Sequence, residues 1–273
     1  SVMKKPPIFA LVLVCLSAVP SAAQNPIPAP ETELAVIDPK AHNLLARLVE
    51  RYKRFQTFSG VVEARTSAPV PWNFQRQRLT LERRKGAIST FTPAQNGFKG
   101  ETIRRVTDGI QILETNASFS GRHTMEKIQM SPQTMPQFLR SSGADFTGWS
   151  LFFGDNLAVG LLSPNLRSLK WGAVQTKGAP WQTVEIQSSG VPGDAAVKLW
   201  IDVKNLHLRR VETRLTPRDS KKTDTFIEDY SEIVFDQPIP AATFSTQPPK
   251  NSRLVWAFPS ESEGVVATPP MRN

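Results

Sequence analysis

Cysteine, histidine and tyrosine are all scarce in this chain of 273 residues. Cysteine occurs once, at Cys15, and histidine three times, at His42, His123 and His207. A single cysteine excludes an internal disulfide scaffold and a zinc site built on thiolates. The three histidines show no metal-binding spacing. The sequence therefore predicts neither a metal site nor stabilisation by disulfides.

The common catalytic motifs are also missing. The chain has no Gly-x-Ser-x-Gly, no Gly-Lys-Ser/Thr phosphate loop, no Gly-x-Gly-x-x-Gly and no His-Glu-x-x-His. A serine triad assembled from distant residues stays open, because triads do not follow sequence order, but no residue points to one. The adjacent carboxylates Glu228 and Asp229 are interpreted as a solvated strand end. We predict that the protein is not an enzyme and uses no cofactor.

The N-terminal segment 1–23 has the features of a secretory signal peptide. Lys4 and Lys5 precede an apolar run over 8–19, and the small residues 21–23 then offer a cleavage site before Gln24. Cys15 leaves a lipid-modified N-terminus as an alternative, although the bulky Val14 precedes it. We predict cleavage after Ala23 and export to the periplasm.

The rest of the chain is predicted to form a single domain over 41–254. A proline-rich leader over 24–40 precedes it, and a flexible tail over 255–273 follows it. Residues 44–55 have helical spacing of their apolar positions. Strands are predicted at 58–64, 76–83, 88–91, 103–106 and 110–113, and again near 166–176, 181–187, 197–203, 208–215 and 223–235.

The order of these elements predicts a mainly β protein. Asp108-Gly109 is a strong hairpin turn, and strands joined by short turns form an antiparallel meander. The segment from Ser131 to Pro164 is predicted to be a helical insert between the two runs of strands. So many strands must curl or close to protect their edges.

Positive charge exceeds negative charge, with 33 Lys and Arg against 24 Asp and Glu, giving a net charge of +9. Eight basic and two acidic residues lie between Arg76 and Arg105. This cluster is either a solvated outer strand face or a surface that attracts lipid phosphates or an anionic membrane. No nucleic-acid-binding motif accompanies it, so no nucleic-acid partner is predicted.

Three methionines, Met125, Met130 and Met135, lie close to His123. Thioether sulfurs can bind Cu(I), but a spacing of five residues suits no compact site. The favoured interpretation is a flexible, adaptable apolar surface.

Four segments, in this order, resemble motifs of the periplasmic outer-membrane lipoprotein carrier family (LolA-like). The opening helix runs into Phe58–Glu63, as in the family's first strand, and Val106–Leu113 resembles its Asp-Gly hairpin. Leu199–Asp202 with Leu208–Val211 resembles a strand pair of the family. The closing signature is the most specific: Tyr230–Phe235, then Ile239-Pro240 and Phe244–Pro249.

This resemblance implies a half-open antiparallel β-barrel of about 10–11 strands, with helices covering its concave face. It also implies a carrier that holds lipid or lipoprotein acyl chains for transfer across the envelope. An inner-membrane exporter or an outer-membrane acceptor would be its partner, and the carrier is predicted to be a monomer. The alternative is an envelope lipid sensor or a protein-binding regulatory module on the same fold.

The residues predicted to line the lipid-binding cavity lie on apolar strand faces and in the helical insert. They are Leu79, Leu81, Phe91, Ile112, Phe138, Phe152, Phe153, Leu157, Trp171 and Leu199. Plain core packing is the alternative for each of them. In the family, an arginine followed by proline couples lid closure to cargo release. Arg84 matches that arginine as a candidate gate, but Lys85 stands at the position of the proline.

Overall fold

The structure is a computed structural model. It describes residues 35–68, 73–82, 84–94, 100–116, 125–130, 138–139, 146, 148–149, 166–175, 180–189, 193–217, 220, 222–248 and 253–254. These residues group into two compact units, which are described separately. The first unit comprises residues 1–54, 66–68 and 145–229, and the second comprises residues 55–65, 69–144 and 230–273. Among the described helices, none has the length and apolarity that crossing a membrane requires.

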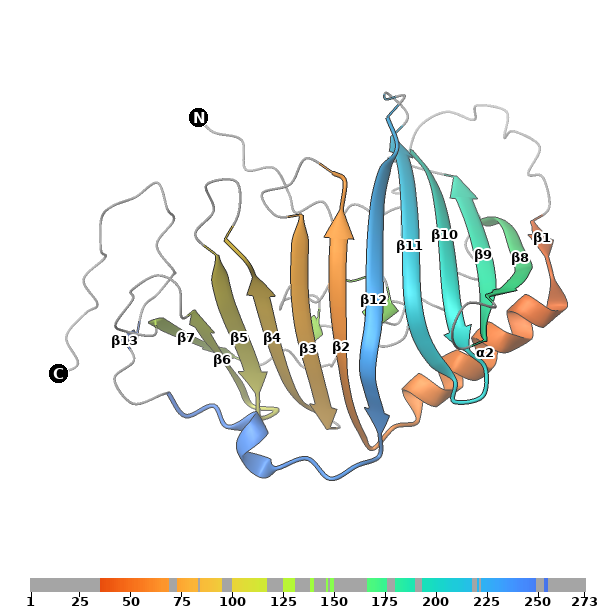
Figure 1. Cartoon of the computed structure of the whole chain (residues 1–273). Coiled ribbons are helices and arrows are strands. Elements are labelled where there is room, and N and C mark those ends of the chain that lie inside the picture. Colours follow the sequence, from red (N-terminus) through yellow and green to blue (C-terminus); the bar gives the residue numbers. More distant parts are fainter. Residues whose placement is uncertain are drawn as a thin grey trace, which may run out of the picture. The chain divides into compact units, whose positions relative to one another are not determined.

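The first unit contains the strand order β1-β8-β9-β10-β11-β12 (Figure 1). The bounds are Val36–Ile37 for β1, Leu166–Gln175 for β8, Trp181–Ser189 for β9, Gly193–Asp202 for β10, His207–Pro217 for β11 and Asp224–Phe235 for β12, whose last residues belong to the second unit. Strands β8 to β12 pair in antiparallel fashion, whereas the two-residue strand β1 is parallel to β8.

The second unit contains the strand order β2-β3-β4-β5-β6-β7-β13. The bounds are Thr57–Thr66 for β2, Phe74–Glu82 for β3, Lys85–Thr92 for β4, Glu101–Thr107 for β5, Gln111–Asn116 for β6, Met125–Met130 for β7 and Arg253–Leu254 for β13. A short 3₁₀ helix, η1, covers Ala241–Phe244. All neighbours from β2 to β7 are antiparallel, and only β13 is parallel to its neighbour β7.

The sequence-based fold class is confirmed in its main features. The structure is mostly β, its sheet is overwhelmingly antiparallel, and β1 and β13 stand at the two open ends of the strand order. Ten predicted strands correspond to β2–β6 and β8–β12. Strands β1, β7 and β13 were not predicted. Two of these have only two residues, too few to produce a visible alternation of apolar and polar positions.

The predicted first helix is α2, which covers Pro39–Lys53. Asp38 caps it, because its Oδ1 accepts hydrogen bonds from the backbone N–H groups of Lys40, at 2.8 Å, and Ala41, at 3.3 Å. Pro39 suits the first turn, where its missing N–H costs nothing. One face of the helix is buried, and it carries Ala41, Leu44, Leu45, Leu48 and Tyr52. Helix α2 contacts β8 (Figure 1). The Tyr52 hydroxyl accepts a hydrogen bond from Leu208 N–H on β11 at 3.3 Å.

The predicted helical insert lies almost entirely outside the described residues. Phe138 and Leu139 in the second unit, and Gly148 and Trp149 in the first, are its helical residues that the structure describes. Phe138, Leu139 and Trp149 are buried. The predicted single domain over 41–254 stays a prediction.

Candidate functional site

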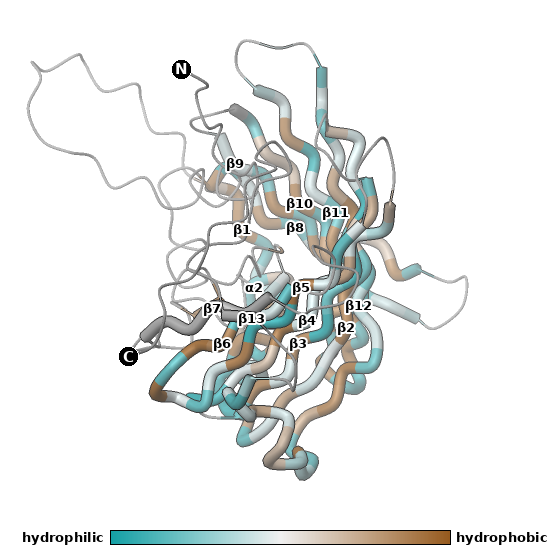
Figure 2. The backbone as a smooth tube through the Cα atoms, turned by 90° about the vertical axis from the view of Figure 1, so that its left-hand side faces the viewer, coloured by the Kyte–Doolittle hydropathy of each residue, from teal (hydrophilic) through white to brown (hydrophobic). Residues whose placement is uncertain are grey.

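In the second unit, strand β3 has two faces of different chemistry. Alternation along β3 places Gln77, Leu79 and Leu81 on one face, and Arg76 and Arg78 on the other. The first is called the leucine face, and the second the arginine face. Figure 2 shows hydrophobic segments, in brown, and hydrophilic segments, in teal, along the backbone of the strands.

Three of the predicted cavity residues lie on the leucine face, and a fourth, Phe138, packs over it. Leu79 and Leu81 are fully buried, at 0% exposed, and Ile112 is buried on β6. The register links Leu81 to Gly86, Gly86 to Thr107 and Thr107 to Ile112, so these positions form one row across β3–β6. Phe58 on β2 begins the same row opposite Leu81.

Phe138 covers this row from a different segment of the chain. A Cβ added to Gly86 would lie only 2.5 Å from Phe138 Cε1 and 3.3 Å from Leu81 Cδ2. The aromatic ring therefore occupies the space that a side chain at position 86 would need. Phe138 is itself buried. The row is thus mainly apolar and is covered at Gly86 by an aromatic side chain from a distant part of the sequence.

Phe91 does not belong to this site. It pairs with Arg76, lies on the arginine face of β4 and is 46% exposed. The reason is strand parity: Gly86 and Ile88 of β4 point to the leucine face, so Phe91, three residues after Ile88, points away from it. Phe91 therefore lies apart from the leucine face, and its assignment to a lipid-binding cavity stays a prediction.

In the first unit, Leu199 and Trp171 share a face of the sheet. The register joins Trp171 to Val184, Val184 to Leu199 and Leu199 to Val211 across β8–β11. Leu199 is buried, whereas Trp171, next to an irregularity in β8, is 37% exposed. These residues form a second apolar row, which lies within the first unit.

Glu228 was not identified as a buried residue from the sequence. It pairs with Val211 on the Leu199 face and is only 1% exposed. Its Oε2 accepts a hydrogen bond from Gly148 N–H at 3.1 Å. The interpretation of a solvated strand end is therefore wrong for Glu228. Its neighbour Asp229 points to the opposite face and contacts Arg210 at 3.5 Å.

The remaining predicted residues are less informative. Phe152, Phe153 and Leu157 lie outside the described residues. Arg84, the candidate gate, is exposed in the turn between β3 and β4. Its Cβ lies near Gly109 of the β5–β6 turn, 3.5 Å from where a Cβ of that glycine would be. Its gating role stays a prediction.

The basic cluster between Arg76 and Arg105 is divided between the two faces. Arg76 and Arg78 lie on the arginine face and both contact Glu232, at 3.5 and 2.5 Å. Arg104 also lies there and donates to the Thr243 carbonyl at 3.0 Å, and burial lowers the pKa of its guanidinium. Arg105 lies on the leucine face, where it pairs with Glu114. The structure therefore shows these four arginines engaged within the protein and not as one uniform cationic surface.

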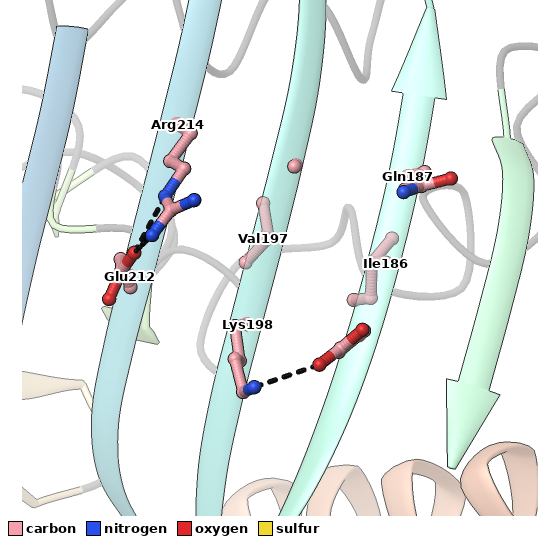
Figure 3. Close-up of a pocket in the computed structure, with 8 residues that line it drawn as sticks. Ile186, Gln187, Val197, Lys198, Glu212 and Arg214 are labelled. Carbon is pink, nitrogen blue, oxygen red and sulfur yellow. Dashed lines mark hydrogen bonds and ion pairs between the residues drawn. The ribbon is translucent and has the colours of Figure 1, made fainter. Parts of the chain in front are cut away.

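A depression of about 260 Å³ lies on the side of β9–β11 opposite to the Leu199 face (Figure 3). Its four charged residues form two ion pairs: Lys198 with Glu185 at 2.8 Å, and Arg214 with Glu212 at 2.7 Å. None of the predicted cavity residues lines it. Its polar, internally paired lining does not suit an acyl chain.

Comparison with known proteins gives similar solved structures at low sequence identity. No family model and no curated protein sequence matches the chain. LprF from Mycobacterium bovis is 11% identical, with a TM-score of 0.47 over 74% of this chain and 97% of that protein. The lipoprotein LppX from Mycobacterium tuberculosis is 14% identical, with a TM-score of 0.42 over 73% and 98%. A LolA superfamily protein from Nitrosomonas europaea is 13% identical, with a TM-score of 0.30 over 75% and 97%.

Proposed function

We propose that the protein is an exported carrier that binds an acyl chain of a lipid or lipoprotein on the leucine face. The observation that carries this proposal is the apolar row from Phe58 to Ile112, covered by the Phe138 ring at Gly86. An aromatic group from another segment of the chain, Phe138, covers the row at Gly86. Displacing that ring would open an apolar surface to a flexible hydrocarbon chain.

The energetics suit such a carrier. Burial of each methylene contributes about 0.8 kcal/mol, so a long acyl chain represents on the order of 10 kcal/mol. A carrier must replace most of this burial with its own apolar side chains. It must also release the chain, so the cover must be displaced at modest cost. The family resemblance of the sequence supports the same function, with transfer between an exporter and an acceptor across the periplasm.

Native mass spectrometry of residues 24–273, purified from an envelope extract without detergent, tests this proposal. We expect an added mass that organic solvent removes and that fragments as acyl chains. Leu81→Glu places a charge in the apolar row and should abolish this added mass in a folded protein. Phe91→Glu is the matched control, because Phe91 is exposed on the arginine face, and it should retain the ligand.

Leu199→Glu applies the same test to the first unit. Loss of the ligand in this variant would extend the site to the Leu199 face. Wild-type protein that carries no ligand and takes up no added lipid would contradict the proposal. Retention of the ligand by folded Leu81→Glu would remove the leucine face from the site.

One observation favours the alternative of a sensor or protein-binding module. Phe138 is already buried against Gly86, as a permanent part of a protein core would be. In that case the cover never leaves the leucine face and the function resides on another surface. A bare polypeptide mass without lipid uptake is the outcome expected for this alternative.

A further inference from the structure

The leucine face changes from apolar to polar along its strands. The first row, Phe58, Leu81, Gly86, Thr107 and Ile112, contributes mainly apolar groups. Four residues earlier in β3, Gln77 aligns with Val62, Thr90, Ile103 and Asn116 in a second row. A single-chain amphiphile lying along the strands would meet a mainly apolar row at one end. At the other end it would meet a mixed row, in which polar side chains lie beside Val62 and Ile103.

Polar side chains on this face satisfy one another in pairs. Between the two rows, Arg105 pairs with Glu114, so the ionic groups there compensate each other. Asn116 Nδ2 donates to Glu101 Oε2 at 3.0 Å. The polar end therefore offers no uncompensated positive charge from Arg105 to select an anionic head group.

Among the described residues of this face, Gln77 departs from this pairing. Its side chain is 0% exposed, and its Nε2 donates to Thr90 Oγ1 at 3.1 Å. Its Oε1 is buried and has no hydrogen-bond partner among the residues that the structure describes. A buried carbonyl oxygen without a donor destabilises a fold. The unsatisfied acceptor lies on the same face as Leu79 and Leu81, two residues from the apolar groups that would hold a hydrocarbon chain.

We infer that Gln77 selects amphiphiles with a neutral hydrogen-bond donor, a hydroxyl or an amide N–H, next to the acyl chain. This inference rests on the proposed function and specifies its ligand class. The Gln77 oxygen accepts the donor of the ligand head group, while the tail lies toward Leu81 and Ile112. An ionised fatty acid has no donor to offer, so it leaves the Gln77 oxygen unsatisfied.

The test compares two probes of equal chain length, 1-monododecanoylglycerol and dodecanoate, by their dissociation constants at pH 8. Wild-type protein should bind the glyceride roughly tenfold more tightly, as expected when a ligand satisfies a buried acceptor. Gln77→Met keeps the size of the side chain and removes the acceptor, so it should bind the two probes with nearly equal affinity. Circular dichroism and the unfolding midpoint confirm that the variant is folded.

Gln75→Met is the matched control. Gln75 lies on the same face of β3 and makes the analogous bond from Nε2 to Thr92 Oγ1 at 3.1 Å, but it is only half-buried. This variant should retain the preference for the glyceride.

The outcomes separate the inference from the proposed function. Equal binding of both probes by wild-type protein overturns the inference but does not contradict the carrier function. This comparison needs only wild-type protein, so it tests the inference even if Gln77→Met does not fold. A folded Gln77→Met that keeps the preference also overturns it. Wild-type protein that binds neither probe overturns the proposed function and the inference together.

Discussion

Gly86 and Phe138 lie far apart in the sequence and depend on each other in the structure. The Phe138 ring fills the position that a Cβ of Gly86 would need, with its Cε1 2.5 Å from that point. Gly86 is therefore required by this close approach, although its own φ is not in the left-handed region. At the residue scale, the missing side chain at position 86 leaves the space from which the Phe138 ring covers the apolar row.

Gly86→Ala should lower the free energy of unfolding. The overpacking cost of about 1–3 kcal/mol outweighs the roughly 0.5–1 kcal/mol by which alanine is otherwise favoured over glycine in a strand. Urea unfolding of Gly86→Ala, Phe138→Leu and the double variant measures the coupling. We expect Gly86→Ala to cost clearly less when Phe138 is leucine. An equal cost in both backgrounds would show that the ring does not restrict position 86.

At the scale of an element, the β5–β6 turn is tied to the segment after η1. Asp108 Oδ1 accepts from the backbone N–H groups of Ile110 and Gln111, at 2.8 and 3.0 Å. Its Oδ2 accepts from the Thr246 hydroxyl at 2.9 Å, and Gln111 Nε2 donates to the same hydroxyl. Burial alone would raise the pKa of Asp108, but these hydrogen bonds together hold it below its ordinary value. The turn thus anchors the segment that contains the closing sequence signature.

Asp108→Asn should be less stable than wild type at pH 7, because it weakens the hydrogen bonds that the carboxylate accepts. The loss should be only about 1 kcal/mol, since the group is largely solvated and its charge is screened. Because the pKa of Asp108 is lower in the folded state, its ionised carboxylate stabilises the fold above the unfolded-state pKa of about 3.9. This stabilisation is lost as the pH falls through the folded-state pKa. The difference between wild type and variant should therefore shrink below about pH 4. Asp194→Asn, at an exposed position of β10, is the control for general pH effects. A difference independent of pH would assign the effect to shape and not to charge.

At the scale of the whole molecule, two strands run through both compact units. Strand β12 begins in the first unit and ends in the second, and the end of β2 belongs to the first unit. Unfolding one unit alone would require breaking strands that the other also uses. The chain should therefore unfold as a single domain, as predicted for residues 41–254.

Leu81→Ala in the second unit and Leu199→Ala in the first unit test this cooperativity. Each removes a buried side chain and should cost about 2–5 kcal/mol. We expect each variant to shift one common transition, seen alike by tryptophan fluorescence and far-ultraviolet circular dichroism. Two transitions, with each variant moving only one of them, would contradict a single domain.

The sequence by itself determined the elements of this protein and much of the pairing between them. Helix α2 and ten of the strands follow from the spacing of apolar residues, and the Asp108-Gly109 turn follows from residue chemistry. Leu79, Leu81 and Ile112 could be placed in an apolar site because every second residue of a strand shares a face. The same parity, counted from Ile88, would have excluded Phe91.

Only the tertiary structure decided what covers each face and which polar groups remain unpaired. The buried Glu228 carboxylate accepts a hydrogen bond from the backbone N–H of Gly148, which lies 80 residues earlier in the chain. Gln77 bonds to Thr90 because the register of β3 and β4 aligns them, and no described residue donates a hydrogen bond to its oxygen. Such contacts join segments that are distant in the sequence. The local spacing of apolar residues predicts a helix or a strand, but it does not show which distant segment packs against it.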